Sequence, residues 1–436
     1  MKAPVRNPSL FRQRDFALLW SGQTVSLFGT QFTYVALPLT AVVVLDATPM
    51  ESGILSALTT LPFLLFGLAV GVLLDRRSRR PILIGADVVR ALALFWVPVA
   101  YFLGVLSIAQ LFVVAFVVGT MTVFFDLAYQ SYLPNLVGRE KLMEANSKLQ
   151  VSESLAEVGG PGAAGALISV LGAPLVVAAD ALSYVVSTLA VSRLPADASP
   201  VEPSRTGPSV WTSIREGVSV VARHHILRWC TTTAVLANLF EGTLMAVFFL
   251  FLARENMIGS AGIGLVVASG GVGGLCGALL VDTLTRRFGV GPMLVLSMVL
   301  PGAGYLLLAT AHGNSWWAVG TAAAANFITL LGLPIFNVTV ISLRQAVTPD
   351  QLLGRVNATV RTCAWGALSL GSVIGGTLGS AFGLRETVLV AAGGAFSAAL
   401  LLLASPVRAV RRLDGAGAVA AVSGTSEPRD TPGENP

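Results

Sequence analysis

The sequence predicts an all-α polytopic membrane protein with twelve transmembrane helices in two pseudo-symmetric six-helix halves. Three observations support this fold class: the composition, the recurrence of long apolar segments, and short motifs that repeat between the two halves of the chain. The composition is 54% hydrophobic and 12% charged, with a mean hydropathy of +0.76 over 436 residues. The core of a water-soluble protein could not hide so much apolar surface.

Apolar segments of about 20 residues, the length that crosses a bilayer as a helix, recur along nearly the whole chain. Taking each segment as one span, we expect helices centred near Ser26, Pro62, Leu92, Phe116, Gly159, Ser183, Phe240, Gly270, Met298, Phe327, Leu368 and Ala395. The first apolar stretch, 16–44, is too long for the core of a signal peptide. We therefore expect it to remain as the first helix.

A polar, proline-containing linker between the sixth and seventh helices divides the chain. The expected units are an N-terminal half, this cytoplasmic linker, a C-terminal half and a tail, at 1–194, 195–225, 226–408 and 409–436. Within the linker, apolar residues recur at helical spacing opposite charged ones, which predicts an amphipathic helix on the membrane surface; they are Trp211, Ile214, Val218 and Val221. The tail cannot bury a core and is expected to be disordered.

The positive charge predicts the orientation, because cytoplasmic loops hold an excess of Lys and Arg. Nearly all of it lies in the two ends of the chain, the linker, and the turns around Arg79, Lys141, Arg286 and Arg355. The opposite turns hold only Arg254 and Arg385. Both termini should therefore be cytoplasmic, and we expect a multi-pass protein of the bacterial cytoplasmic (inner) membrane.

Several classes of function are disfavoured. The cysteines (Cys230, Cys276, Cys363) lie singly in apolar segments and share no ligand spacing with the histidines, so we expect neither disulfides nor a metal site. A net charge of +5 is explained by basic loops beside anionic lipid, without nucleic acid. No phosphate-binding GxxxxGK[ST] loop and no catalytic arrangement of Ser, Cys or His is present. We expect no cofactor, no catalytic residue and no enzyme.

Two charged loops repeat between the halves. GVLLDRRSRRP, from Gly71, and GALLVDTLTRRFG, from Gly277, both follow an apolar helix, and the spacing from Asp75 to Arg79 equals that from Asp282 to Arg286. Glycines keep the same register: Gly160, Gly165 and Gly172 match Gly371, Gly376 and Gly383. Such a repeat is typical of transporters that bind their substrate between two related halves.

The first of these loops resembles the loop between helices two and three of the major facilitator superfamily, GxxxDRxGRR, with Ser78 in place of its second glycine. FRQRDFALLWSGQTVSLFGTQF, ADVVRAL, LPNLVGREKLMEANSKL and DALSYVVSTL are similar to the branch that contains the enterobactin exporter and macrolide efflux proteins. The resemblance covers about residues 10–408. It implies that the loop clamps helix ends in the outward-open state and releases as the halves rock.

We therefore expect a conformational latch. Its candidate residues are Gly71, Asp75, Arg76, Arg79, Arg80, Asp126, Asp282 and Arg286, with Asp126 at the cytoplasmic end of helix four as a second acceptor for Arg79. A charge-assisted bond at the half-desolvated membrane edge contributes more than an exposed ion pair. The alternative is a static anchor that only sets the topology.

Ionisable residues inside the membrane are costly and mostly functional. Glu157 lies ~16 Å into helix five, at a rise of ~1.5 Å per residue, and Glu241 is close to the middle of helix seven. These two, followed by Asp180 and Glu153, are the candidates for proton coupling. Permanent pairing of Glu241 with Arg90 or Arg361 is the alternative, whereas Asp87 and Arg90 are expected to neutralise each other.

Helix five continues into GPGAAG, in which Gly160, Pro161 and Gly165 favour a tightly packed kink. The segment also resembles the GPxxGG motif of proton-exchanging exporters, with Ala164 in place of one glycine. Polar and adaptable apolar residues at helical spacing are either cavity lining or contacts between helices. They are Gln23, Thr30, Tyr34, Asn238, Met245, Phe248, Asn326 and Asn337.

Together these observations predict a secondary active transporter that exports a small amphipathic organic molecule, such as a drug, siderophore or secreted metabolite, by alternating access and proton antiport. The alternatives are a lysophospholipid-type flippase or an importer of the same fold, then a transporter-like sensor or a membrane enzyme. The expected partners are the small-molecule substrate, protons and the lipid bilayer, with no nucleic acid, and we expect a monomer.

Overall fold

The computed structural model describes residues 10–74, 78–138, 141–195, 210–313, 315–348 and 350–410, and these are almost entirely helical. The long helices of the first half are α1 (Arg14–Leu39), α2 (Pro49–Leu74), α3 (Arg79–Phe102), α4 (Ile108–Val137), α5 (Leu142–Leu171) and α6 (Ala173–Ser192). Those of the second half are α8 (His225–Leu250), α9 (Ser260–Phe288), α10 (Val290–Ala309), α11 (Trp316–Val347), α12 (Asp350–Phe382) and α13 (Leu384–Ala404). Each expected helix centre lies in a different one of these, so the prediction of twelve membrane helices is confirmed.

Shorter helices complete the fold. They are η1 (Leu10–Arg12), η2 (Thr40–Val44), α7 (Val210–Arg223), η4 (Phe251–Glu255) and η5 (Pro406–Ala409). In the described ranges, eleven of the long helices are long and apolar enough to cross a membrane by composition. The remaining long helix, α12, contains Arg355 and Arg361 and packs between α2 and α8. Both charges have protein neighbours, because Arg355 forms an ion pair with Glu216 and Arg361 lines a pocket with Asp126.

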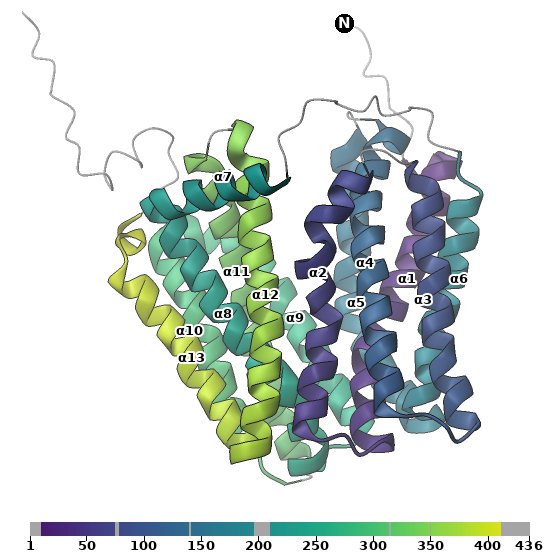
Figure 1. The fold of residues 1–436 in the computed structure, drawn as a ribbon. Helices are drawn as coiled ribbons and strands as arrows, with labels where there is room; N and C mark the ends of the chain where they lie inside the picture. Colours follow the sequence, from purple (N-terminus) through teal and green to yellow (C-terminus); the bar gives the residue numbers. More distant parts are fainter. Residues whose placement is uncertain are drawn as a thin grey trace, which may run out of the picture.

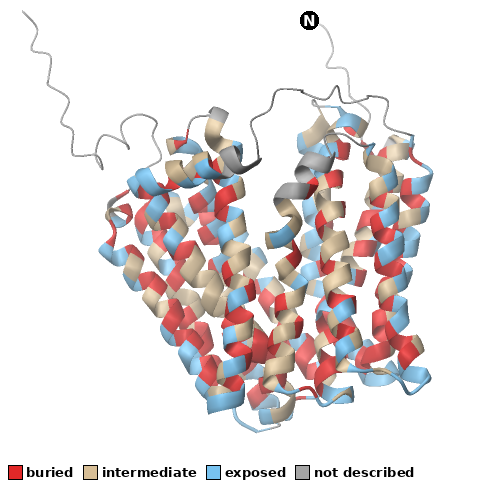
Figure 2. Ribbon diagram, in the orientation of Figure 1, coloured by how far each residue is buried: buried red, intermediate tan, exposed pale blue. Residues whose placement is uncertain are grey.

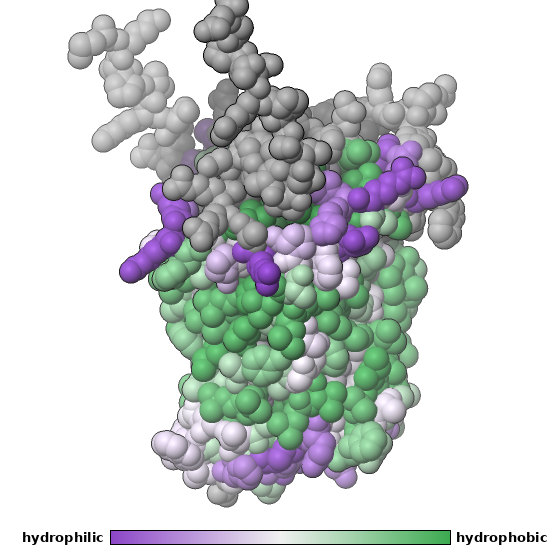
Figure 3. Space-filling model, turned by 90° about the vertical axis from the view of Figure 1, so that its left-hand side faces the viewer, coloured by the Kyte–Doolittle hydropathy of each residue, from purple (hydrophilic) through white to green (hydrophobic). Residues whose placement is uncertain are grey.

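The two ends of the bundle differ in charge and in structure. The beginning of α1 and all of α7 lie at one end, called here the α7 end, and η2 and η4 lie at the opposite η4 end (Figure 1). The face in Figure 3 shows an apolar band between two more polar ends, as a bilayer requires. Along the helices, buried and exposed residues alternate (Figure 2), because each helix faces neighbours on one side and lipid on another.

The structure reproduces the sequence repeat in detail. The helices α1 and α8 each continue into a short π-helix, η2 or η4, and each of these is followed by a non-glycine residue with positive φ, Asp46 (53°) or Met257 (52°). Gly172 and Gly383 both have positive φ at the turns that follow α5 and α12. Matched residues thus occupy equivalent places, and the two halves share one architecture.

The halves meet mainly through two helix pairs, α5 with α9 and α2 with α12. Gly165 packs on Gly264 in the first pair, and Gly53 packs on Gly376 in the second, so a Cβ at Gly165 or Gly53 would lie 2.8 Å from the Cα of its partner. Small residues allow this close approach of helix backbones. Both contacts lie near the η4 end, whereas α2 and α12 diverge toward the α7 end (Figure 1).

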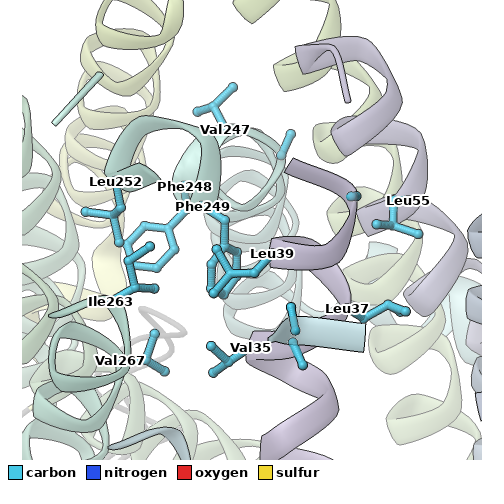
Figure 4. Packing of buried hydrophobic residues seen from close by; sticks show 14 of the residues in the cluster. Val35, Leu37, Leu39, Leu55, Val247, Phe248, Phe249, Leu252, Ile263 and Val267 are labelled. Atoms are coloured by element: carbon cyan, nitrogen blue, oxygen red, sulfur yellow. The ribbon is translucent and has the colours of Figure 1, made fainter. Parts of the chain in front are cut away.

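An apolar cluster supports the same contact. Val35 and Leu39 of α1 and Leu55 of α2 belong to one buried cluster with Phe249 of α8 and Ile263 of α9 (Figure 4). Because the cluster spans both halves, apolar burial holds them together in this conformation.

The expected amphipathic helix is present as α7, but its neighbours are protein. Val221 packs in a cluster with Leu227, Val356 and Val360, and Glu216 forms an ion pair with Arg355 of α12. Val221 of the apolar face therefore packs on α8 and α12, whereas Val218 of the same face is 47% exposed. The preceding linker residues and the tail after Val410 lie outside the described residues.

Candidate substrate cavity and charged sites

A cavity of about 600 Å³ lies between the halves, within the range of ligand-binding pockets. It is bounded by α1 and α5 of the first half and by α8, α9, α10 and α11 of the second. Its lining extends from the middle of the bundle toward the α7 end. The lining residues nearest that end are Gln150 on α5 and Asn337 and Val338 on α11. A solute in this cavity would contact both halves.

The cavity brings together Glu157 of α5 and Glu241 of α8, one carboxyl from each half. The lining residues that the structure describes include no Lys, Arg or His. The remaining surface is mostly apolar, with amide and hydroxyl groups from Gln31, Asn326 and Thr329. The lining is thus acidic, and it favours a ligand that carries positive charge together with apolar surface.

Glu241 has few charged neighbours. Among the described residues it forms no ion pair and accepts no hydrogen bond, and it lies close enough to Tyr34 and Tyr305 to interact electrostatically with their hydroxyls. Arg90 is bound by Asp87 inside the first half, and Arg361 lines a different pocket with Asp126. The alternative of a permanent pair between Glu241 and either arginine is not seen in this conformation.

The GPGAAG segment lies beside Glu157 and against the other half. Pro161 lines the cavity, Gly160 packs on Gln31 of α1, and Gly165 packs on α9. The backbone of Gly271 in α9 packs on Glu157 itself, since a Cβ there would lie 2.8 Å from the carbonyl carbon of Glu157. Motion of α5 against α9 would therefore move Glu157 and this interface together.

Some of the residues that the sequence suggested for the cavity line it in the structure, and others do not. Tyr34, Met245, Phe248, Asn326 and Asn337 line it. The others do not: Gln23 is buried in α1, Thr30 bonds Ser26 and Tyr184, and Asn238 donates to the carbonyl of Ala234. Of these three, only Thr30 makes the contact between helices that was the stated alternative, because Tyr184 is on α6 whereas the bond of Asn238 lies within α8.

The polar residues of the lining include some that were not predicted, among them Gln31, Gln150, Ser154 and Tyr305. Gln150 and Ser154 share with Glu157 the i, i+4, i+7 face of α5, so helical periodicity around Glu157 was a usable signal. Gln31 is three residues before Tyr34 on α1, so the same signal was available for it, whereas Tyr305 stands alone in apolar sequence and only the packing of α10 places it at the cavity.

A second charged group lies inside the first half. Asp87 and Arg90 are both buried and form the expected ion pair, and the Arg90 guanidinium stacks on the rings of Phe125 and Tyr184, 4.4 and 4.1 Å from their centroids. Asp180 is fully buried and accepts from the hydroxyl of Ser183 at 2.9 Å. Neither Asp180 nor the exposed Glu153 lines the cavity.

The latch residues are only partly described. Asp75 and Arg76 lie outside the described residues, and Gly71 is in the last turn of α2. Arg80 donates to the carbonyls of Val191, at 3.3 Å, and Ser192, which ties α3 to the end of α6. These are contacts inside one half.

Three other latch candidates are Asp126, Asp282 and Arg286. Asp126 is not at the end of its helix, because α4 continues about three turns beyond it to Val137, and its charged neighbours are Arg90, Arg361 and Glu153. Asp282 and Arg286 pair as their spacing suggests, with Nε to Oδ1 at 2.9 Å, but both are exposed and lie on the same helix, α9. That pair joins no second helix.

Two related six-helix halves around a central cavity define a transporter, not an enzyme. The chain belongs to the major facilitator superfamily, and within it to the family described as transmembrane secretion effector, which matches residues 7–422. Efflux transporters are its relatives in sequence.

The chain is 24% identical over 415 residues to macrolide efflux protein A of Streptococcus pyogenes, covering 92% of this chain and 97% of that protein. It is 27% identical over 398 residues to the multidrug efflux pump Tap of Mycolicibacterium fortuitum, covering 89% and 92%. A solved structure of a bacterial homologue of the iron transporter ferroportin, in an inward-facing state, superimposes with a TM-score of 0.70 at 19% identity, covering 90% of this chain and 98% of that one. These similarities agree with the fold and with the resemblance found in the sequence.

Proposed function

We propose that this protein exports a small amphipathic organic molecule from the cell by alternating access, in exchange for protons. The observation that carries the proposal is the central cavity, which holds Glu157 from one half and Glu241 from the other beside a largely apolar lining. A substrate and a proton can compete for such carboxyls, and that competition is the physical basis of antiport. The names of the macrolide and multidrug efflux relatives support export.

We place the α7 end in the cytoplasm, with both chain termini, and the protein in the inner membrane of a bacterium as a monomer. The basic residues at that end, such as Arg79 and Lys141, support this orientation through the excess of positive charge in cytoplasmic loops. The cavity then lies on the cytoplasmic side of the closed η4 end. Substrate would enter from the cytoplasm in this conformation.

Coupling follows from the position of the two carboxyls. In the inward-facing state a protonated carboxyl that meets the cytoplasm releases its proton and attracts a cationic substrate. In the outward-facing state, protons from the higher concentration outside displace the substrate. Glu157 lies on the α5–α9 contact that must change during this cycle, whereas Glu241 lies beside Tyr34 and Tyr305 in the cavity.

The test is transport driven by a pH gradient in proteoliposomes, with tetraphenylphosphonium as the first probe. Glu to Gln keeps the size of the side chain but fixes the neutral form, so the coupling variant should lose uphill transport and keep downhill exchange. Glu144→Gln, at an exposed position at the beginning of α5, is the matched control and should behave as the wild type. If the double variant Glu157→Gln/Glu241→Gln still concentrates the probe, neither residue couples protons, and Asp180 is tested next.

A further inference from the structure

A second, smaller cavity of about 150 Å³ lies beside the central one and closer to the η4 end. Its walls come from α1, η2, α2 and α8, and they are largely apolar. Leu37, Leu55 and Phe249 contribute to them from three helices, and Figure 4 shows these residues within the buried cluster. None of its described lining residues is charged. A cavity of roughly this volume accommodates a group of the size of benzene.

Two residues are shared by the walls of this cavity and the central one. Tyr34 and Met245 line both cavities, and the Tyr34 hydroxyl donates to the sulfur of Met245 at 3.5 Å. The Tyr34 ring also meets Phe249 edge to face, with centroids 6.0 Å apart. A hydrogen bond to a thioether is weak, and the methionine side chain is flexible, so rotation of these side chains would join the two cavities.

The polar groups of the small cavity include one without a partner. The Ser52 hydroxyl is buried and has no hydrogen-bond partner among the described residues. Leaving a buried hydroxyl unsatisfied is unfavourable, and a ligand or a water molecule in the cavity would remove that cost. The Ser52 hydroxyl is therefore available to hydrogen-bond with a ligand that enters the cavity.

The distance between the acidic and apolar regions is short. Glu241 and Met245 are one helical turn apart on α8, so about 6 Å separates their Cβ atoms. A molecule with a cationic group against Glu241 can therefore place an apolar group beyond Met245 if a few methylenes join the two. The acidic lining of the central cavity and the uncharged lining of the small one are complementary to such a molecule.

We propose that the small cavity is a subsite for the aromatic or alkyl end of an organic monocation whose charged end lies against Glu241, with Tyr34 and Met245 as the partition that the ligand displaces. This inference rests on the proposed function, because it uses the central cavity as the site of the cationic end. It assigns the substrate class as amphipathic cations with an apolar group at a defined distance from the charge.

The experiment measures binding of phenylalkyl trimethylammonium ions with one to six methylenes, at equilibrium and without a pH gradient. Purified protein in nanodiscs is used, and partition into empty nanodiscs is subtracted. Wild-type affinity should rise about fourfold per methylene until the ring fills the subsite, and then stay constant. Glu241→Gln should weaken every ion of the series by a similar factor.

Ser56→Phe fills the subsite from α2 and should abolish the dependence on length while leaving the affinity of the shortest ion unchanged. Ser169→Phe, at an exposed position on α5, is the matched control and should keep the wild-type dependence. If Ser56→Phe does not fold, Leu55→Ala enlarges the subsite and should move the plateau to longer ions.

The subsite is overturned if the affinity of the wild type does not depend on the length of the methylene chain, or if Ser56→Phe keeps the wild-type dependence. It is also overturned if the plateau of affinity in Leu55→Ala lies at the same chain length as in the wild type. Failure of the proposed function gives a different result. The length dependence would then persist in binding, while a pH gradient would drive no transport of any ion in the series.

Discussion

Gly165 of α5 and Gly264 of α9 pack so closely that a Cβ atom on either residue would lie 2.8 Å from the Cα of the other. Gly53 and Gly376 form the equivalent contact between α2 and α12. The sequence repeat already matched Gly165 with Gly376, and the structure places both at the closed η4 end. Alternating access requires both contacts to separate when that end opens.

Gly165→Ala should shift the protein toward the conformation in which the η4 end is open. Overpacking costs about 1–3 kcal/mol, which corresponds to a population change of roughly 5- to 150-fold. The measurement is the distance distribution between spin labels at Val43 and Met257, which are exposed on opposite halves at this end. Gly162→Ala is the control, because a Cβ there meets its neighbour at an ordinary 3.8 Å. Identical distributions in both variants and the wild type would contradict the prediction.

Arg254 and Asp46 join the two halves at the same end. Arg254 donates to the Asp46 carboxylate at 2.6 Å and to the carbonyl of Val42 at 2.9 Å. The Asp46 side chain is 93% exposed, so its removal should change the population of the conformation with an open η4 end by less than about fivefold. Arg254→Ala should have the larger effect. A double-mutant cycle with the same spin labels measures the coupling. Additive effects of the two substitutions would show that the pair contributes nothing.

Asp87 and Arg90 should behave as a buried pair. Removing one partner leaves an uncompensated buried charge, so Arg90→Met or Asp87→Leu alone should lower the free energy of unfolding by about 3–5 kcal/mol. The double variant should be closer to the wild type than either single one. Thermal unfolding of purified protein measures this. Single variants that unfold at the wild-type temperature would mean that the pair is not structurally important.

The loop before α3 should act on conformation and not on the cavity. Asp75→Asn or Arg79→Ala is expected to abolish transport and to leave substrate binding largely intact. Asp282→Asn is the matched control from the second half, since its exposed pair with Arg286 lies within one helix, and it should keep transport. Normal transport by the Asp75 or Arg79 variant, or a loss confined to binding, would contradict the latch and favour the alternative, in which the loop is a static anchor that only sets the topology.

The orientation of the bundle can be tested with single cysteines in a background without Cys230, Cys276 and Cys363. An impermeant thiol reagent added to intact cells should label a cysteine at Ser315, at the η4 end, and not one at Ser78, at the α7 end. The positive charge at the α7 end is the reason for this expectation. The reverse pattern of labelling would invert the topology.

Periodicity and repetition made most of the fold readable. A segment of about 20 apolar residues is read as a membrane helix because its backbone must be hydrogen-bonded internally in lipid, whatever surrounds it. The cavity was readable only in part, since a polar residue on a membrane helix can face either a cavity or a neighbouring helix. Thr30 and Tyr34 are one turn apart on α1, yet Thr30 bonds Tyr184 within its own half, and Tyr34 faces Met245 of the other.

The sequence by itself determined the number and order of the helices, the two-fold repeat and the family, because these depend on local hydropathy and on short motifs along the chain. Spacing along the helix also predicted the pair of Asp87 with Arg90, which the structure contains. Only the structure showed that Glu241 has no ionic partner among the described residues and that Asp126 lies about three turns before the end of its helix. The physical reason is that pairing in a low-dielectric interior depends on the rotation and closeness of packed helices, which hydropathy and spacing along the chain do not encode.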